Sequence, residues 1–264
     1  MHVPPVDGRR EPIFNLPAVV TATIALLVAI HAVRSALLAP DTDLEFLLGW
    51  AVVPARWTAA FDPARAETIL REAAAGFAGP MAEAREALAR YVLAEGAKPW
   101  TALTYALLHG SWTHVLVNGV WLAAFGTPVA RRCGALRFLA LGGVCAVAGA
   151  LAYWLANPPS IVPMVGASAA ISGWMAAAAR FVFGPGRAPF GRGIEEAHLR
   201  PRQTIAEMAR NRGAAVFLVT WFASNLLFGL AAAPLGIADA AVAWEAHIGG
   251  FLAGLMLFPW LDRR

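Results

Sequence analysis

Six long apolar stretches constrain this chain more than any other feature, because each has about the length that crosses a bilayer core as a helix. We place them at residues 17–38, 111–130, 136–156, 166–183, 214–233 and 242–260. They account for nearly all the hydrophobicity of a 264-residue chain in which 14% of residues are charged, whereas soluble domains carry about 25%. The sequence therefore predicts an all-α membrane protein, a six-helix bundle without a separate soluble domain.

The first stretch is expected to stay in the membrane, since it is too long for a signal-peptide core and no clear cleavage site follows Ser35. Cys133 and Cys145 are twelve residues apart near and within the third stretch. On a helix this separation is about 18 Å, so we expect no disulfide between them.

The distribution of basic residues predicts the orientation of the bundle. Arginines gather before residue 17, between the second and third stretches, between the fourth and fifth, and after residue 260, whereas the connections at 157–165 and 234–241 carry no lysine or arginine. Positive charge favours the cytoplasmic side. We therefore expect residues 1–16 and 261–264 to be cytoplasmic. The pI of about 9.7 then reflects topology, and no nucleic-acid partner is predicted.

The first connection, about 39–110, is expected outside the membrane. Its segment "ARAETILREAAAGFAGPMAEAREALARYVLAEG" has apolar residues at helical spacing and a break at Gly79-Pro80, which predicts two amphipathic helices. Trp50, Trp57 and Trp100 are expected at the membrane interface, where one edge of the ring meets water. The abundance of arginine over lysine, together with many alanines, suggests a GC-rich bacterial genome and hence an inner-membrane location.

Three of the stretches place polar residues at one depth. With this topology the second, fourth and sixth run inward, so His114, Ser168 and His247 lie roughly 5–10 Å below the outer end. Asn118 is one turn deeper than His114 on the same helix face.

Each of these residues also has a purely structural interpretation. Small residues such as Ser168 commonly line contacts between membrane helices, and Asn118 could join helices by a hydrogen bond. Intramembrane histidines are costly and therefore usually functional. His109, just outside the second stretch, could serve hydrogen bonding at the mouth or chemistry. His31, beside Arg34, is expected to reach the interface.

Small residues around the serine and histidine favour the reactive interpretation. In "AHIGGFLAG", Ala246, Gly250 and Gly254 form a stripe at a four-residue period, and the fourth stretch has its own small surface at Gly166, Ala170 and Gly173. Such surfaces let two helices approach closely. Ser168 and His247 could then form the hydrogen bond that activates a serine, which is otherwise a weak nucleophile.

Three motifs together resemble the rhomboid intramembrane serine proteases. "HGSWTHVLVNG" is similar to the family's His-x4-His-x3-Asn, "GASAAISG" to its Gly-x-Ser box and "AHIGGFLAG" to its Ala-His-x2-Gly signature. They occur in the family's order on the second, fourth and sixth stretches. "RFVFGPG" and "WFASNLLFG" also look like bacterial members, so the resemblance extends from about Trp100 to the end.

The resemblance implies a role for each matched residue. Ser168 would be the nucleophile and His247 its general base, while His114, Asn118 and the Ser168 backbone N–H would form the oxyanion hole. Gly166, His109 and Gly250 would support the site. We found no acidic residue at this depth to orient His247, since Asp239 and Glu245 lie near the outer end of the sixth stretch and Glu245 points elsewhere around the helix. A dyad is therefore expected, with no metal or cofactor.

The implied substrates are single-pass or polytopic membrane proteins whose spans are locally unstable, cut near the outer face after small residues. In this sequence 17–260 would be the six-helix rhomboid-like domain. Three positions depart from the family pattern: Thr101 where arginine often follows the tryptophan, Ala169 where glycine is commonest, and Ser172 where well-known members have a tyrosine against the histidine.

Two other functions fit parts of the pattern. A rhomboid-like pseudoprotease would bind membrane proteins without cutting them, although such proteins normally lack the serine or the histidine. A transporter or haem-binding bundle could use His114 and His247 as ligands, but it would leave the Gly-x-Ser box unexplained.

Overall fold

The computed structural model describes residues 16–184, 197–231 and 243–262, and these are mostly helical. Extended backbone pairs at an isolated antiparallel bridge between Val52 and Met164. Because the described residues are mostly helical and this bridge lies outside any named strand, the predicted all-α class is confirmed.

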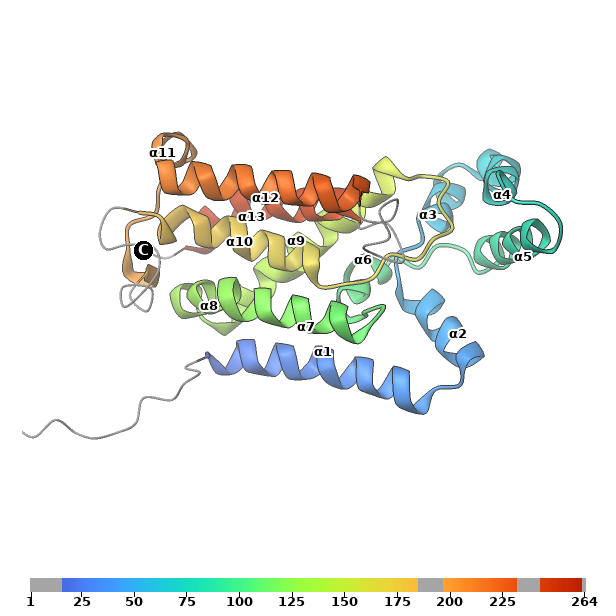
Figure 1. Ribbon diagram of the computed structural model, residues 1–264, viewed down its shortest axis with the longest axis horizontal. Helices are drawn as coiled ribbons and strands as arrows, with labels where there is room; N and C mark the ends of the chain where they lie inside the picture. Colours follow the sequence, from blue (N-terminus) through green and yellow to red (C-terminus); the bar gives the residue numbers. More distant parts are fainter. Residues whose placement is uncertain (1–15, 185–196, 232–242, 263–264) are drawn as a thin grey trace, which may run out of the picture.

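The longer helices run roughly along the long axis of the molecule and form a bundle (Figure 1). They are α1 (Ala18–Leu37), α7 (Trp112–Trp121), α8 (Thr127–Cys133), α9 (Ala135–Ala156), α10 (Ser168–Val182), α12 (Arg212–Ala231) and α13 (Trp244–Leu261). Four further helices, α2 (Pro40–Trp50), α3 (Pro54–Phe61), α4 (Ala66–Ala74) and α5 (Pro80–Ala94), gather at one end, and we call them the α2–α5 unit. The remaining short elements are η1 (Pro63–Arg65), α6 (Thr101–Thr104), η2 (Tyr105–Leu107), η3 (Leu122–Gly126), η4 (Ala197–Leu199) and α11 (Ile205–Arg210).

Each of the six predicted stretches contains helix. By length and apolar composition, α1 and α9 could cross a membrane, and α12 contains a shorter apolar segment, Arg212–Leu227. The second stretch is continuous from α7 to α8 but passes through the π-helical turn η3. Pro128, near the start of α8, has no N–H to give to Ala124, and this explains why α-helical bonding is interrupted there.

Helix α10 lies at the centre of the bundle and is buried along nearly its whole length. It packs against α9 and α13 through glycine and alanine. A methyl group at Gly250 would overlap the Ala169 carbonyl, and one at Gly254 would overlap the Gly173 backbone. The predicted small-residue stripe is thus the place where α13 meets α10, with the backbones in direct contact.

The α2–α5 unit has an apolar core of its own. Its buried residues are Leu48, Val53, Ala55, Ile69, Ala73, Ala89 and Val92, and Ile161 from the connection between α9 and α10 packs among them. The two predicted amphipathic helices are α4 and α5, separated at Gly79, whose φ of +56° suits glycine. The expected interfacial position of Trp57 is wrong. This ring is buried against Trp154 of α9, 5.7 Å between centroids, because α3 docks on the end of α9.

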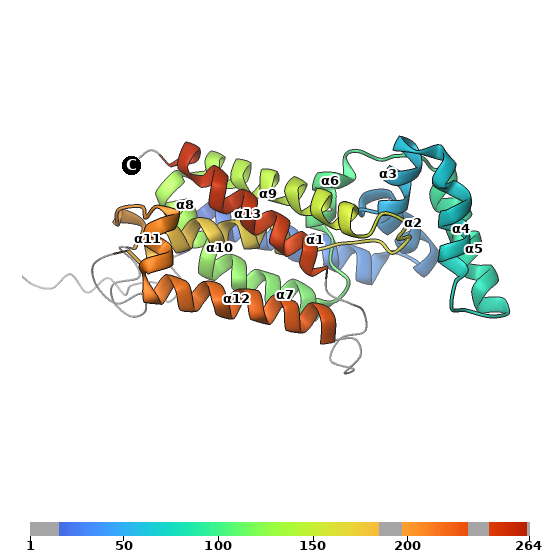
Figure 2. The ribbon, with the colours of Figure 1, turned by 90° about the horizontal axis from the view of Figure 1, so that it is seen from above.

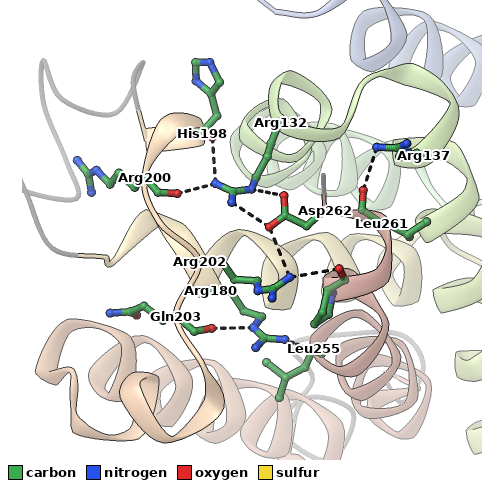
Figure 3. Close-up of polar contacts among 11 residues, drawn as sticks. Arg132, Arg137, Arg180, His198, Arg200, Arg202, Gln203, Leu255, Leu261 and Asp262 are labelled. Carbon is green, nitrogen blue, oxygen red and sulfur yellow. Dashed lines mark hydrogen bonds and ion pairs between the residues drawn. The ribbon is translucent and has the colours of Figure 1, made fainter. Parts of the chain in front are cut away.

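The opposite end of the bundle is held by arginines (Figure 3). Arg132 of α8 forms a two-pronged ion pair with Asp262, at 2.9 Å for both bonds, and its third nitrogen donates to the carbonyls of His198 and Arg200. Arg180 of α10 donates to the carbonyls of Gln203 and Leu255. These contacts join the ends of α8, α10 and α13. Both ribbon views place them far from the α2–α5 unit (Figures 1 and 2).

Candidate active site

Ser168 is the first residue of α10. The preceding segment is pinned by two backbone bonds between Met164 and Val52, at 2.8 and 3.2 Å, and by a bond from the Gly166 N–H to the Tyr105 carbonyl at 3.0 Å. Gly166 has φ of +127°, which an L side chain rarely adopts. The serine is therefore held at a helix N-terminus, where free N–H groups and the helix dipole favour negative charge.

His247 of α13 lies beside this serine. Its Nε2 is 2.8 Å from Ser168 Oγ, although the two residues are 79 positions apart. The contact of Gly250 with the Ala169 backbone explains the approach, because Gly250 is one turn from His247 and Ala169 adjoins Ser168. Ala169 is tolerated where the family usually has glycine because its methyl group faces Gly149 of α9.

The second ring nitrogen of His247 also has a partner. Nδ1 is 2.5 Å from Oδ1 of Asn225 on α12. The sequence predicted no orienting partner for His247, because an acidic side chain was expected in that role and the partner is an amide. The signal in the sequence was an amide side chain within the mostly apolar fifth stretch, eight residues before its outer end at residue 233. Glu245 does point away as predicted, and it accepts a hydrogen bond from Asn157 at 3.2 Å. Asp239 lies outside the described residues.

His114 borders the same space as Ser168. A Cβ built on Gly166 would lie 2.8 Å from the His114 ring and 3.6 Å from Ser168 Oγ. Glycine at 166 thus lets the His114 ring pack against the backbone beside Ser168. The hydroxyl of Ser111 caps α7 by accepting from the His114 backbone N–H at 3.1 Å.

Asn118 is buried one turn further along α7. Its Nδ2 donates to the His114 carbonyl at 3.0 Å. The second hydrogen of that amide is the one that could be offered to a reacting carbonyl. The structure therefore brings Ser168, His247 and His114 close together at the start of α10. Asn118 is bonded to the backbone of His114, one turn further along α7.

His109 lies on the loop that precedes α7 and is fully buried. Its ring contacts that of His114 edge to face, 4.9 Å between centroids, and neither ring nitrogen has a hydrogen-bond partner among the described residues. Burial lowers the pKa of His109 to about 3, so the ring is neutral at physiological pH.

The loop that carries His109 is fixed from α1. Arg34 donates to the His109 carbonyl at 3.0 Å and pairs with both carboxylate oxygens of Asp43. The expectation that His31 reaches the interface is wrong, since this ring is buried edge-on against Trp112, 4.8 Å between centroids. His31 and Arg34 are three residues apart on α1 and therefore share a face. Because Arg34 bonds to the buried loop, His31 is buried on the same side.

The segment that begins at Trp100 is anchored without the arginine usual in the family. The Thr101 hydroxyl donates to the Lys98 carbonyl at 2.5 Å, and the Trp100 indole donates to the Gly49 carbonyl at 3.1 Å. Ser172, the third departure, is buried inside α10. Position 172 therefore offers no tyrosine ring to His247, whose ring instead contacts Ser168 and Asn225.

The helical bundle thus holds a serine and a histidine in hydrogen-bond contact near one end. The rhomboid domain model matches residues 96–264, which is more than half of the chain, and the chain therefore belongs to the rhomboid family. It is accordingly an integral membrane protein. The family consists mostly of intramembrane serine proteases that act on membrane-protein substrates within the bilayer, together with inactive relatives. No curated protein matched the chain.

Proposed function

We propose that this protein is an intramembrane serine endopeptidase that uses Ser168 and His247 to cut transmembrane segments of other membrane proteins near the outer face. The observation that carries the proposal is the 2.8 Å separation between Ser168 Oγ and His247 Nε2. A hydrogen-bonded imidazole can accept the hydroxyl proton as the oxygen attacks, which is the geometry that serine catalysis needs.

In the proposed reaction the Oγ–H proton passes to His247 Nε2 while Oγ bonds to the scissile carbonyl carbon. The resulting oxyanion would be stabilised by the Ser168 backbone N–H at the start of α10, by His114 and by the second N–H of Asn118. His247 then protonates the leaving amine, and the peptide C–N bond breaks to leave an acyl-enzyme. Water attacks this ester by the same route in reverse and frees Ser168.

We further propose a topology of six spans at the stretches given above, with residues 1–16 and 261–264 in the cytoplasm and 39–110 outside. The division into a 17–260 membrane domain and two cytoplasmic ends belongs to the same proposal. The arginines that hold the ends of α8, α10 and α13 support it, because basic residues favour the cytoplasmic side. A bacterial inner membrane is the proposed location.

Substrates in this proposal are single-pass or polytopic proteins with locally unstable spans, since a peptide bond inside a regular helix is hydrogen-bonded and shielded. Small residues are expected before the cut. The haem or transporter alternative is disfavoured because both ring nitrogens of His247 are already engaged, by Ser168 and Asn225. The remaining alternative is an inactive binding scaffold, which the following experiment distinguishes.

A fluorophosphonate probe should label the wild-type protein in liposomes at Ser168, and an unstable transmembrane peptide should be cleaved. Ser168→Ala is expected to abolish both reactions, and His247→Ala to reduce both severely while the protein stays folded. Added chelator should change neither rate. Folded wild-type protein that neither labels nor cleaves would favour the scaffold, and labelling undiminished in His247→Ala would remove His247 as the base.

A further inference from the structure

We propose that Asn225 is a positioning residue that holds His247 in the tautomer and orientation needed to accept the Ser168 proton. This inference rests on the proposed function of the Ser168–His247 pair. It assigns a third member to that pair from α12, a helix that supplies none of the other site residues.

The amide of Asn225 has a fixed orientation. Its Nδ2 donates to the Trp221 carbonyl one turn earlier on α12 at 2.8 Å, so Oδ1 is the atom directed at His247, 2.5 Å from Nδ1. An oxygen can accept a hydrogen bond but has no hydrogen to give. The contact is therefore satisfied when His247 carries its proton on Nδ1.

A proton on Nδ1 decides what Nε2 can do. In the neutral ring the other nitrogen then has a free lone pair, and this nitrogen lies 2.8 Å from Ser168 Oγ. The serine hydroxyl donates and the histidine accepts, which is the direction required of a general base. If the Asn225 amide were reversed, its N–H would favour a proton on Nε2 and the base would be lost. In serine proteases the wrong tautomer lowers kcat by about 10⁴-fold.

Packing one turn away keeps Asn225 in register with His247. Trp221, which precedes Asn225 by four residues, stacks on Phe251, which follows His247 by four residues, with ring centroids 4.2 Å apart. Both aromatic rings are buried. Helices α12 and α13 thus share two successive contacts, an aromatic stack and the His247–Asn225 bond, and the stack fixes the rotation of α12 that presents the amide.

Asn225 is neutral, and this limits what it can contribute. A carboxylate in the same place would stabilise the imidazolium by charge, whereas an amide oxygen supplies a directed dipole in a site with little water. The expected contribution is therefore orientation and tautomer. Residues that orient imidazole ligands in metal sites typically contribute about 10- to 100-fold.

The test compares Asn225→Leu, Asn225→Asp and the wild type in liposomes, with Val219→Ala as the matched control. Val219 is on the same helix with an exposed side chain (69%). Asn225→Leu should lower kcat by about 10- to 100-fold with KM little changed. Asn225→Asp keeps an acceptor and should recover most of that loss, while moving the acid limb of the pH–rate profile to higher pH because a carboxylate stabilises the protonated ring. Val219→Ala should match the wild type.

A measurement on the resting protein separates this inference from the proposed function. In ¹⁵N-histidine NMR spectra, with His247 assigned by loss of its signal in His247→Ala, the wild type should show Nδ1 protonated and Nε2 bare. Asn225→Leu should shift this population toward Nε2–H. Wild-type protein with an inert serine but the Nδ1–H tautomer would overturn the protease and keep the positioning role. Active protein whose pH profile, kcat and tautomer are unchanged in Asn225→Leu would overturn the positioning role alone.

Discussion

Glycine and alanine make the closest contacts between α9, α10 and α13, whereas aliphatic side chains around the buried Arg56 hold the α2–α5 unit together. The outward surface differs as well. Helices of the bundle expose large apolar side chains such as Leu136 (81%) and Leu155 (72%), while the α2–α5 unit exposes both the apolar Phe61 (78%) and the ion pair of Glu86 with Arg90. Both regions are helical, but the exposed surface of the α2–α5 unit mixes apolar and charged side chains.

The difference follows from what burial achieves in each medium. In water, removing aliphatic surface from solvent drives packing. Lipid tails are as apolar as leucine, so bundle helices gain from close backbone contact and from satisfied polar groups instead. A polar residue buried in the bundle is then expected to serve chemistry, and one buried in the α2–α5 unit to serve stability. Three substitutions test this contrast.

The largest effect is expected where two backbones touch. Gly250→Ala places a methyl group against the Ala169 carbonyl, so α13 must move away from α10 and carry His247 with it. A displacement of about 1 Å at a reacting group lowers the rate by about 100-fold, and overpacking costs about 1–3 kcal/mol. We expect kcat/KM for a cleaved transmembrane peptide to fall by at least about 100-fold.

Gly143→Ala on α9 is the matched control, because its added methyl group would meet Leu103 at an ordinary 3.6 Å. Its activity and melting temperature should stay near those of the wild type. Equal activity in the two variants would show that the close contact of α10 with α13 does not set the position of His247.

A comparable or smaller effect is expected from Asn118→Ala. If the second N–H of this amide binds mainly the transition state, kcat should fall by about 10- to 1,000-fold with little change in KM. Protein yield and melting temperature should barely change, as steady-state kinetics and thermal unfolding would report. A variant that unfolds, while its surviving fraction keeps normal turnover, would instead assign Asn118 to helix association and weaken the contrast between the two regions.

The smallest effect on activity is expected from Arg56→Met. Arg56 is buried and donates to the carbonyls of Val92, at 3.1 Å, and Leu48. Methionine fills much of the space but leaves these carbonyls unpaired, at about 1–3 kcal/mol. Hydrogen exchange should speed up by about 5- to 150-fold in α3–α5 and stay unchanged in α10 and α13. Fluorophosphonate labelling at Ser168 should continue at the wild-type rate.

Arg90→Met removes an exposed pair and is the control for this substitution, with an expected change below about 0.5 kcal/mol. If Arg56→Met instead slowed labelling as much as Gly250→Ala slows cleavage, the two regions would form one cooperative unit. The contact that would couple them is the hydrogen bond from the Trp154 indole of α9 to the Thr58 hydroxyl of α3 at 2.9 Å.

The sequence by itself determined where the apolar stretches lie along the chain and which of them carry the polar residues His114, Ser168 and His247. Apolar length is a local property, so the six stretches could be located without knowing their neighbours. The break at Gly79-Pro80 was predictable for the same reason, since the conformational freedom of glycine and the missing N–H of proline act on the chain directly. The stripe of Ala246, Gly250 and Gly254 likewise indicated a close helix contact before any partner was known.

Tertiary structure decided what each side chain faces. The sequence shows Asn225, Trp57 and His31 as a polar residue in an apolar stretch, a tryptophan near a membrane boundary and a histidine near a span end. Their partners, His247, Trp154 and Trp112, come from segments far along the chain. Which partner is met depends on the rotation of each helix about its axis, and that rotation is set by the packing of the whole bundle rather than by the residues of one stretch.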